Sequence, residues 1–529
     1  MPDLSRLGAA QLRALVEASA QRITEQEQAL EVAAQRIALL EEIIRLRKAQ
    51  KYGASSEKGG PQLGLFDEAE LAVALSDLID QLPEASDESD EIKHLREERK
   101  SRQRAFAQEL PRKRIELRLS EEEKRGAVKT FFAKVKEELE YIPAQLNVLE
   151  YWQEKAVFAD DDGEHIVTAS RPTHPLGKCA ASLSLIAQVI IGKYADGLPL
   201  HRQESIFKRL GHEIGRGTMA TWVIDLESKL QPLLERYRAV QNSAAYLQAD
   251  ETRIQVLKEK GKTAQSNKWM WITRGGPPGQ HSVLFEYDPT RGGQVITDLL
   301  DGFAGVLQAD GYSGYAPVCA EKTLTRIGCW DHARRKFVEA SRGANRKNPP
   351  KGKLPLADEA IARIRVLYRL EQELEQASDA ERLHGRQEKS LPLLEDFKAW
   401  LDQHQDKVMK GGLLHKAIQY CLNQWEYLVG YCQRGDLKIS NALAENAIRP
   451  FAVGRKNWLF ADTTHGAKAS AAWYSLIETA KLHQLNPQAY IEHLLENIAV
   501  ANTPEKLDQL LAWNVKLDQP AQVRTAQQH

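Results

Sequence analysis

The sequence predicts a multidomain α+β protein in which one mixed sheet lies between long helical segments. Two observations predict this class. Residues 246–309 follow the two-residue period of strands, whereas residues 181–224 and 340–500 are dominated by helical patterns. The chain has 529 residues, too many for one hydrophobic core. A prior of roughly 100–200 residues per domain therefore predicts several domains.

The bulk composition restricts the class of protein further. Hydrophobic residues make up 42% and charged residues 27% of the chain, as in ordinary globular proteins, and the net charge is −1. Any affinity for a polyanion must therefore come from local basic patches. Five cysteines without a CxxC pair indicate neither a disulfide framework nor a thiolate zinc finger. No signal peptide or membrane-spanning run is evident, so a cytoplasmic protein with no membrane partner is expected.

Changes in periodicity and charge divide the chain into eight expected segments. They are a coiled-coil helix at 1–50, an acidic linker and basic segment at 51–118, a small strand-containing region at 119–170, a helical helix-turn-helix-like region at 171–240, the first part of a mixed α/β core at 241–340, an all-helical insertion at 341–437, the rest of the core at 438–500, and a C-terminal helix with a disordered tail at 501–529.

The N-terminal segment carries a heptad repeat. Apolar side chains recur every seven residues at Val16, Ile23, Leu30, Ile37 and Ile44. Sustained heptads predict a coiled coil and hence a homo-oligomer. The intervening core positions include a serine and a glutamine, so a helical hairpin within one chain stays open as the alternative.

The next segment reverses its charge along the sequence. Residues 59–92 contain ten acidic residues and no Lys or Arg, which is typical of a linker, whereas residues 93–118 contain ten Lys or Arg and four Glu. The basic run has two interpretations, a solvated helix face or a phosphate-contacting surface.

The helical region contains a possible DNA-reading unit. Leu210–Gly211 predict a tight turn between a helix at 202–210 and a second helix at about 216–224. In a helix-turn-helix, Arg216 and Thr218 would face the major groove. The same pattern also occurs in plain helical bundles, so both interpretations stay open here.

The segment 246–309 predicts the order strand, strand, strand, helix, strand. The strings YLQADETRIQVL, NKWMWITRG and HSVLFEYD form the strands, GGQVITDLLDGF the helix and AGVLQAD the fourth strand. This is the order of a ribonuclease-H-like core. Asp250 lies on its first strand, Asp310 follows the fourth, and Glu445 lies in a later Ala-rich helical stretch.

Three such carboxylates suit divalent metal ions. Two ions about 3.5–4 Å apart can clamp the attacking and leaving oxygens of a phosphoryl transfer. The plain alternative is that Asp250, Asp310 and Glu445 are ordinary strand-end and helix-surface acids. Glu251 and Asp331 are neighbouring acids that would replace them if the assignment failed.

Several strings of the chain resemble the transposases of the insertion sequence 66 family, in order and over nearly the whole length. They are KYGASSEK, YADGLPLHRQESIFKRLG, ADETRIQVL, DGYSGY, CWDHARRKF, NALAENAIRPFAVGRKNWLF and YSLIETAKL. The resemblance implies a DDE transposase, with Asp250, Asp310 and Glu445 as the catalytic and metal-binding triad. It implies two Mg²⁺ or Mn²⁺ ions as cofactors and double-stranded DNA, both element ends and target, as partner.

The resemblance also implies roles for residues around the triad. A Cys-x-x-His element of the family matches Cys329 and His332, which places His332 near the scissile phosphate; a packed, satisfied histidine is the alternative. Basic side chains beside these residues are candidates for DNA contact or plain surface charges. They are Arg334, Arg335, Arg449, Arg455 and Lys456. Relatives are often encoded beside small accessory proteins, which are possible further partners.

The chain departs from the family at one place. Family members commonly carry paired CxxC motifs before the helical domain, but this chain has no cysteine before Cys179. The sequence therefore predicts no zinc. Three rival functions stay open: a non-catalytic DNA-binding regulator, a nuclease without strand transfer, and an oligomeric scaffold. A bacterial, nucleoid-associated location follows from the transposase interpretation.

Overall fold

The computed structural model describes residues 112–517, apart from short gaps between 121 and 143, residues 161–162 and residues 344–354. The chain divides into two units, residues 1–136 and 137–529, which are described separately. The predicted coiled coil, most of the 51–118 segment and the last twelve residues lie outside the described residues. In the first unit, the described residues include a turn at 122–125, next to which the Ser120 hydroxyl contacts the Glu123 carboxylate at 2.9 Å.

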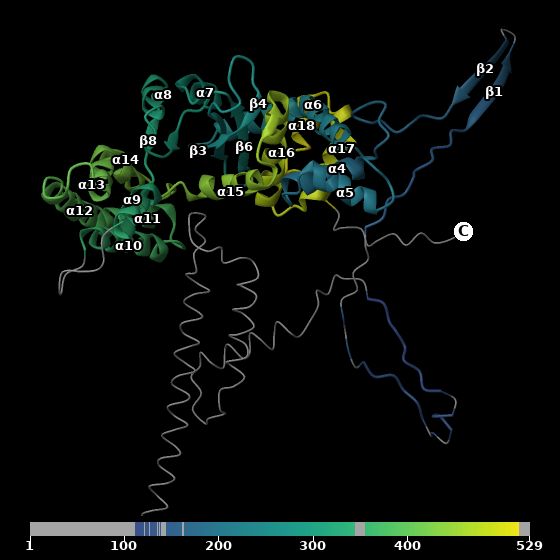
Figure 1. Ribbon diagram of the computed structural model, residues 1–529, viewed down its shortest axis with the longest axis horizontal. Helices are drawn as coiled ribbons and strands as arrows, with labels where there is room; N and C mark the ends of the chain where they lie inside the picture. Colours follow the sequence, from purple (N-terminus) through teal and green to yellow (C-terminus); the bar gives the residue numbers. More distant parts are fainter. Residues whose placement is uncertain are drawn as a thin grey trace, which may run out of the picture. The chain divides into compact units, whose positions relative to one another are not determined.

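The second unit contains the regular structure, and Figure 1 shows its arrangement. Its strands are β1 (Lys155–Asp160), β2 (Gly163–Thr168), β3 (Tyr246–Ile254), β4 (Val256–Lys258), β5 (Lys268–Gly275), β6 (Ser282–Asp288), β7 (Val306–Gln308), β8 (Thr325–Ile327) and β9 (Ala461–Thr463). Its α-helices are α4 (Leu183–Tyr194), α5 (Leu200–Arg209), α6 (Arg216–Asn242), α7 (Gly293–Leu299), α8 (Tyr315–Glu321), α9 (Trp330–Gly343), α10 (Leu356–Glu373), α11 (Asp379–Gly385), α12 (Leu391–His404), α13 (Leu413–Asn423), α14 (Trp425–Val429), α15 (Ala442–Trp458), α16 (Thr464–Leu482), α17 (Pro487–Asn497) and α18 (Pro504–Asp508). Among the residues described, no helix has the length and apolarity to cross a membrane.

A five-stranded mixed sheet forms the centre of the unit, in the order β6-β5-β3-β7-β8. β3, β5 and β6 pair antiparallel, whereas β7 and β8 run parallel to β3. The four predicted strands and the predicted helix are present as β3, β5, β6, α7 and β7. The sequence pattern did not predict α8 and β8, which are only seven and three residues long. Segments this short carry too few residues to show a period.

Helix α16 covers the free edge of the sheet at β6. The Ser475 hydroxyl accepts a hydrogen bond from the Phe285 amide at 2.7 Å, and the Thr479 hydroxyl accepts one from the Val283 amide at 3.0 Å. Thr479 also donates to the Val283 carbonyl at 3.1 Å. These side chains form hydrogen bonds with backbone amide and carbonyl groups at the edge of β6, which would otherwise be able to pair with another strand. The Ala-rich composition of α16 lets it approach the sheet closely.

The helical region before the sheet differs from its predicted form. The turn is present, and Gly211 takes a φ of +99° that favours glycine. The second helix, however, does not end near 224 but continues as α6 to Asn242, so the predicted short helix is wrong. Buried residues continue along it through Leu226, Leu233 and Tyr237. This apolar stripe packs against the C-terminal helices, and burial of that face favours a long helix.

Helices α10 to α14 lie in the range of the predicted helical insertion, and they share a core with Val306 of β7 and Ile327 of β8. That core is built around Phe397, Trp400 and Ile418 and extends to Trp330 at the start of α9. Arg386 is fully buried there; its Nε donates to Glu371 at 2.8 Å and its Nη1 to the Tyr431 carbonyl at 3.0 Å. A buried charge held by this many partners fixes the helices around it.

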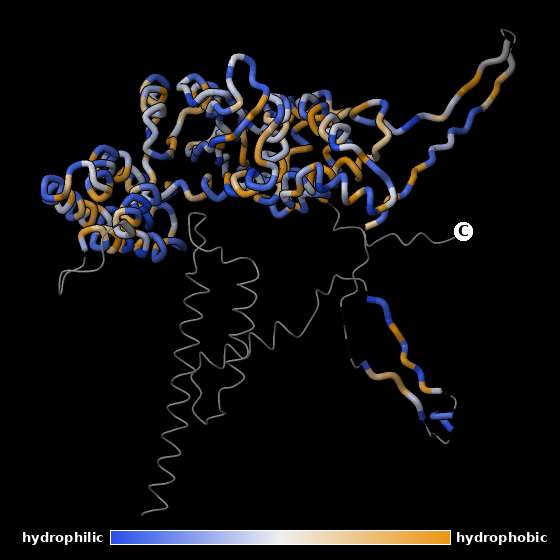
Figure 2. Tube along the Cα trace, viewed as in Figure 1, coloured by the Kyte–Doolittle hydropathy of each residue, from blue (hydrophilic) through white to orange (hydrophobic). Residues whose placement is uncertain are grey.

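The region 119–170 contains a two-stranded antiparallel hairpin of β1 and β2. Apolar stretches along both strands are orange in Figure 2. Val157 is 62% exposed and Ile166 63% exposed, and the two residues are cross-strand partners. The segment thus has the strand character that the sequence predicted.

Candidate active site

Two copies of the same four-residue string lie side by side in the sheet. Leu-Gln-Ala-Asp occurs at 247–250 on β3 and at 307–310, where it begins on β7 and continues two residues past its end. The parallel register pairs Leu247 with Leu307 and Gln248 with Gln308. Asp250 follows two residues later within β3, and Asp310 two residues later beyond β7. Among the described residues, the group of three side chains placed to hold a metal ion is Cys329, His332 and Glu445, so the structure gathers Glu445 there and not with the two aspartates.

A buried glutamine pair ties these strands together. Gln248 is 2% exposed and Gln308 fully buried. The Gln248 amide donates to the Gln308 side-chain oxygen at 2.9 Å, and Gln308 donates to the carbonyls of Gly328 and Lys438 at 2.8 Å each. β3, β7, the end of β8 and the segment before α15 are therefore joined by two side chains.

The same pair positions the helix that carries Glu445. Gln248 donates to the Ser440 carbonyl at 3.0 Å and accepts from the Ala444 amide at 3.1 Å. Asn441, the residue before α15, donates to the Ala249 carbonyl at 3.3 Å. These bonds fix the first turn of α15 against β3. Glu445 lies in that first turn, where the helix dipole favours an acidic side chain.

The charges of these carboxylates act on one another. Burial, together with the negative charges of Glu251, Glu445 and Asp310, raises the pKa of Asp250 well above its usual range. The Glu251 amide donates to Oδ1 of Asp250 at 2.9 Å. Asp310 likewise accepts from a backbone amide, that of Tyr312, at 2.9 Å. Carboxylates that repel one another in this way are electrostatically suited to a cation.

Glu251 and Asp331 have structural partners of their own. The Glu251 side chain is 1% exposed, forms an ion pair with Arg291, and accepts from the Tyr315 hydroxyl at 2.8 Å. Asp331 accepts from the Tyr368 hydroxyl at 2.6 Å. Neither acid therefore replaces Asp250, Asp310 or Glu445 as readily as the sequence suggested.

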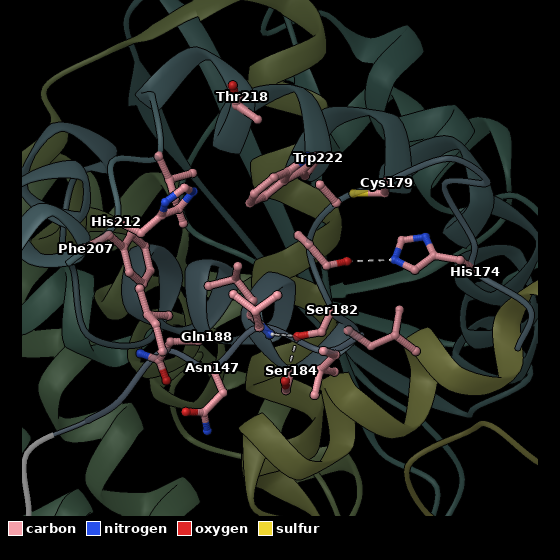
Figure 3. A pocket seen from close by; sticks show the side chains of 18 of the residues that line it. Asn147, His174, Cys179, Ser182, Ser184, Gln188, Phe207, His212, Thr218 and Trp222 are labelled. Carbon is pink, nitrogen blue, oxygen red and sulfur yellow. Dashed lines mark hydrogen bonds between the residues drawn. The ribbon is translucent and has the colours of Figure 1, made fainter. Parts of the chain in front are cut away.

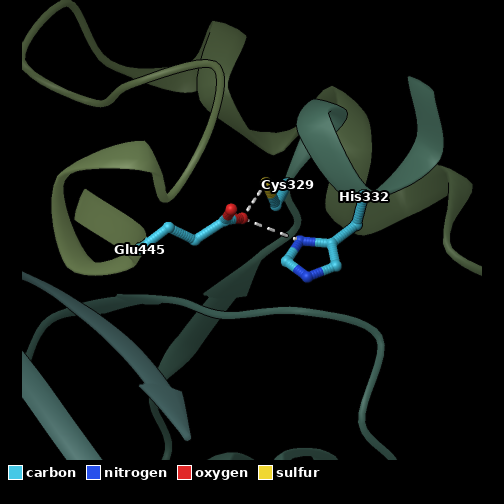
Figure 4. A group of neighbouring side chains, drawn as sticks. All are labelled: Cys329, His332 and Glu445. Carbon is cyan, nitrogen blue, oxygen red and sulfur yellow. Dashed lines mark hydrogen bonds and ion pairs between the residues drawn. The ribbon is translucent and has the colours of Figure 1, made fainter. Parts of the chain in front are cut away.

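Glu445 meets the Cys-x-x-His element at the end of β8 (Figure 4). Its Oε1 lies 3.3 Å from Nδ1 of His332 and 3.9 Å from Sγ of Cys329. The His332 contact does not have hydrogen-bond geometry, and its buried Nδ1 has no hydrogen-bond partner. Nη2 of Arg335 donates to Oε2 of Glu445 at 2.9 Å. Burial lowers the pKa of His332, against the opposing effect of Glu445 and Asp310.

The predicted DNA contacts fall into two groups. Arg334 on α9, and Arg449 and Lys456 on α15, are exposed. Arg335 instead contacts Glu445, and Arg455 donates to the Arg253 carbonyl at the end of β3. The second group therefore contributes to the internal structure of the site.

The predicted helix-turn-helix residues lie at the start of α6. Arg216 and Thr218 are exposed, as predicted. Thr218 also lines a groove with Trp222, His212 and Cys179, which Figure 3 shows from close by. On the far side of the groove, His174 contacts the carbonyl of Ala181 at 3.1 Å.

Some residues important for the site were missed in the sequence. Gln248, Gln308 and Arg291 are not among the residues that the sequence motifs predicted. The repeated Leu-Gln-Ala-Asp string was the available signal for the glutamines. Arg291 has no comparable signal, because its pairing with Glu251 across 40 residues depends on the fold.

Together, these features define a mixed α/β protein with acidic side chains on the central strand β3, just past β7 and in the first turn of α15. Comparison with known proteins identifies its family. Residues 178–469 match "Transposase IS66 family", residues 475–513 match "IS66 C-terminal element", and residues 39–115 match "Transposase C of IS166 homeodomain". The chain belongs to the IS66 transposase family, as the motifs indicated. Membership implies DNA binding and suggests a DNA-processing enzyme.

Relatives from Sinorhizobium fredii (strain NBRC 101917 / NGR234) span most of the chain. The protein named "Uncharacterized protein y4qI" is 30% identical over 506 residues, covering 92% of this chain and 90% of the relative. "Uncharacterized protein y4hP" is 30% identical over 403 residues, covering 74% of this chain and 72% of the relative. "Uncharacterized protein y4jD" is 29% identical over 409 residues, covering 75% and 78%.

Proposed function

We propose that this protein is a DDE transposase that cleaves DNA at the ends of a bacterial insertion sequence and joins them to target DNA. Asp250, Asp310 and Glu445 are its catalytic carboxylates. One observation carries the proposal: Gln248, two residues before Asp250 on β3, fastens the first turn of α15, which bears Glu445, to β3. Asp310 follows β7, the parallel neighbour of β3, by two residues.

The sheet topology supports a ribonuclease-H-like core. Three antiparallel strands come first in the sequence, a helix follows, and two strands then add parallel to β3 on its other side. The first strand is therefore central. One acid then lies within the central strand, and a second lies two residues past the end of its parallel neighbour.

The donor set fits Mg²⁺ or Mn²⁺. Mg²⁺ prefers hard oxygen ligands, and Asp250, Asp310 and Glu445 would hold it. Burial and, after it, the negative charges of Glu251, Glu445 and Asp310 raise the pKa of Asp250, and a cation would relieve the repulsion among these carboxylates. When bound, such ions supply charge neutralisation at phosphorus during in-line displacement.

The surrounding side chains have defined tasks in this proposal. Arg335 orients Glu445 through Oε2, and His332 lies beside the same carboxylate, where it would face a scissile phosphate. The exposed Arg334, Arg449 and Lys456 would contact DNA phosphates flanking the site. Arg216 and Thr218 would read the terminal repeats. Since the net charge is only −1, binding depends on these local groups.

Assembly and location follow as parts of the same proposal. The predicted coiled coil at 1–50 would make the protein a homo-oligomer, which would allow two element ends to be held together. Small accessory proteins encoded nearby would complete the complex. A transposase works on the chromosome, so we place the protein in the bacterial cytoplasm, associated with the nucleoid.

Cleavage and joining assays on the element's own ends test the proposal. The full chain, with any neighbouring small proteins, would be incubated with labelled ends and a target plasmid in Mg²⁺ or Mn²⁺. We expect boundary nicking and strand transfer, and loss of both in Asp310→Asn. Asp301→Asn, on an exposed surface, is the matched control. Cutting without joining would indicate a nuclease, and specific binding without cutting would indicate a DNA-binding regulator.

A further inference from the structure

We propose that Cys329, His332 and Glu445 form a binding site for one thiophilic divalent cation of the zinc class. Their candidate ligand atoms, one sulfur, one nitrogen and one oxygen, all lie within 4.8 Å of one another. Figure 4 shows the three side chains converging from separate elements. This donor set differs in kind from the three carboxylates of the proposed catalytic site.

The separations suit tetrahedral coordination. Zinc bonds of about 2.0–2.3 Å to nitrogen, oxygen and sulfur imply nitrogen–oxygen separations of about 3.4 Å and sulfur–oxygen separations of about 3.6 Å. Nδ1 of His332 lies 3.3 Å from Oε1 of Glu445, and Sγ of Cys329 lies 3.9 Å from that oxygen. The thiol would move toward Oε1 of Glu445 to reach the tetrahedral sulfur–oxygen separation. Three protein ligands leave a fourth position for water or another ligand.

One buried polar atom without a hydrogen bond points to a missing partner. Nδ1 of His332 is buried and has no hydrogen bond, which is costly for a ring nitrogen. Cys329 is 1% exposed, yet its sulfur faces a carboxylate and the Asn441 amide rather than an apolar surface. A cation would satisfy the nitrogen, the sulfur and the carboxylate together.

The site is held by elements that are fixed by other contacts. Cys329 lies two residues past β8, at the level of Asp310 in the neighbouring strand, because Gln308 pairs with Ile327. His332 is in the first turn of α9. Arg335 binds Oε2 of Glu445 and leaves Oε1 toward the other two ligands. Outer contacts of this kind orient metal ligands.

The chemistry of the donors selects the ion. Thiolate and imidazole ligands favour zinc-class ions, whereas Mg²⁺ prefers oxygen. On binding, the Cys329 thiol releases its proton to solvent and the sulfur donates its electron pair to the metal. The sequence predicted no zinc because CxxC pairs are missing before Cys179. A zinc-class ion at Cys329, His332 and Glu445 would make that prediction wrong, although at a different part of the chain.

Binding of such an ion would also affect the reaction, a consequence that rests on the proposed function. Glu445 belongs to both donor sets. An ion held by Cys329 and His332 would keep Oε1 of Glu445 away from the two aspartates. Zinc-class ions would therefore inhibit Mg²⁺-dependent cleavage at concentrations far below that of Mg²⁺.

Cobalt substitution tests the site without any DNA. The full chain would be titrated with Co²⁺, and the thiolate-to-cobalt charge-transfer absorption recorded, followed by displacement with Zn²⁺. We expect one equivalent per chain and loss of the absorption in Cys329→Ser. The matched control is Cys421→Ser, a buried cysteine in α13 outside the cluster, which should keep it. Absence of the absorption in wild type, or its persistence in Cys329→Ser, overturns the site.

A second variant and a second readout separate the two proposals. His332→Gln should weaken Zn²⁺ affinity by more than about 100-fold, since even outer-shell changes cost about 10–100-fold. Circular dichroism would establish that each variant is folded. In parallel, the rate of Mg²⁺-dependent DNA cleavage with Zn²⁺ is divided by the rate without Zn²⁺ for each variant. A cobalt signal without DNA cleavage would support the metal site and count against the transposase proposal. DNA cleavage without a cobalt signal would support the transposase proposal and overturn the metal site.

Discussion

Asp250 on β3 and Asp310 just past β7 each lie two residues beyond a glutamine, and the two glutamines hydrogen-bond to each other at 2.9 Å. The glutamines are buried and the aspartates are half-buried. The hydrogen-bonded pair Gln248 and Gln308 fixes the register of β3 and β7. This register holds the backbone segments that carry Asp250 and Asp310 in place relative to each other. The consequences for stability and binding can be measured in four ways.

The first prediction concerns charge repulsion at Asp250. Because its pKa in the folded protein is raised, the metal-free protein loses stability as pH rises from the ordinary aspartate pKa through the raised value. Asp250→Asn removes this loss, so in EDTA at neutral pH the variant should melt at a higher temperature than wild type. A tenfold difference between the folded and unfolded acid constants corresponds to about 1.4 kcal/mol. The gain should shrink as the pH is lowered.

Mg²⁺ should cancel this difference, because it stabilises only the wild-type carboxylate cluster. Asp301→Asn is the control, since the Asp301 side chain is 90% exposed and should change stability by less than about 0.5 kcal/mol. A lower melting temperature for Asp250→Asn in EDTA would contradict the repulsion argument.

The second prediction concerns Gln248 as a positioning residue. Gln248→Met removes a hydrogen bond from the Ser440 carbonyl, from the Ala444 amide, which keeps the Asn441 carbonyl, and from the Gln308 oxygen, which keeps the Tyr246 hydroxyl. We expect a loss of about 2–3 kcal/mol in the free energy of unfolding, measured in urea. Mg²⁺ affinity should fall as well, because the first turn of α15 loses its attachment to β3.

Gln241→Met provides a matched comparison. Gln241 is also fully buried, and it accepts from the Thr273 hydroxyl at 2.6 Å and donates to the Ser282 carbonyl at 3.0 Å. It should cost similar stability without changing Mg²⁺ affinity. Equal Mg²⁺ affinities in the two variants would show that Gln248 only supports the fold.

The third prediction concerns the ion pair of Arg291 with the buried Glu251. Arg291→Ala leaves that carboxylate with the Tyr315 hydroxyl as its side-chain donor, so the free energy of unfolding should fall by about 3–5 kcal/mol. Arg291 lowers the pKa of Glu251 against the larger effect of burial. Without the arginine that pKa rises further, and the loss should be greatest at high pH and smaller in acid.

Denaturant unfolding at two pH values measures this effect. Adding Glu251→Gln to Arg291→Ala should restore much of the stability, because the uncompensated charge is then gone. A loss that is the same at both pH values and is not rescued would mean that the packing of Arg291 against the Tyr312 ring, 3.7 Å away, dominates instead.

The fourth prediction concerns the exposed arginines beside the site. Arg334→Ala and Arg449→Ala should each weaken DNA binding and reduce the slope of log affinity against log salt by about 1. Fluorescence anisotropy over a salt series measures both. Arg236→Ala is the control. Arg236 lies on α6, and its Nε is 2.7 Å from the Asp508 carboxylate on α18, so its charge already has a partner within the protein. An unchanged slope in both variants would exclude phosphate contacts by these residues.

Much of the fold was predictable because its signals are local. The strand pattern around Asp250, the apolar run before Asp310 and the small residues of α16 each depend on a few adjacent residues. The length of α6 was not predictable in the same way. The turn at Leu210–Gly211 indicates where the helix begins, but the helix continues to Asn242 because its second half is buried against the C-terminal helices.

The sequence by itself determined the acids, their order and the family, because motif identity is carried by the chain. The tertiary structure alone decided which side chains contact each acid. It brings Arg291 to Glu251, and it brings Glu445 next to Cys329 and His332. These partners lie about 40 to 116 positions apart in sequence. Such pairing depends on strand register and helix docking, which buried contacts throughout the core fix together.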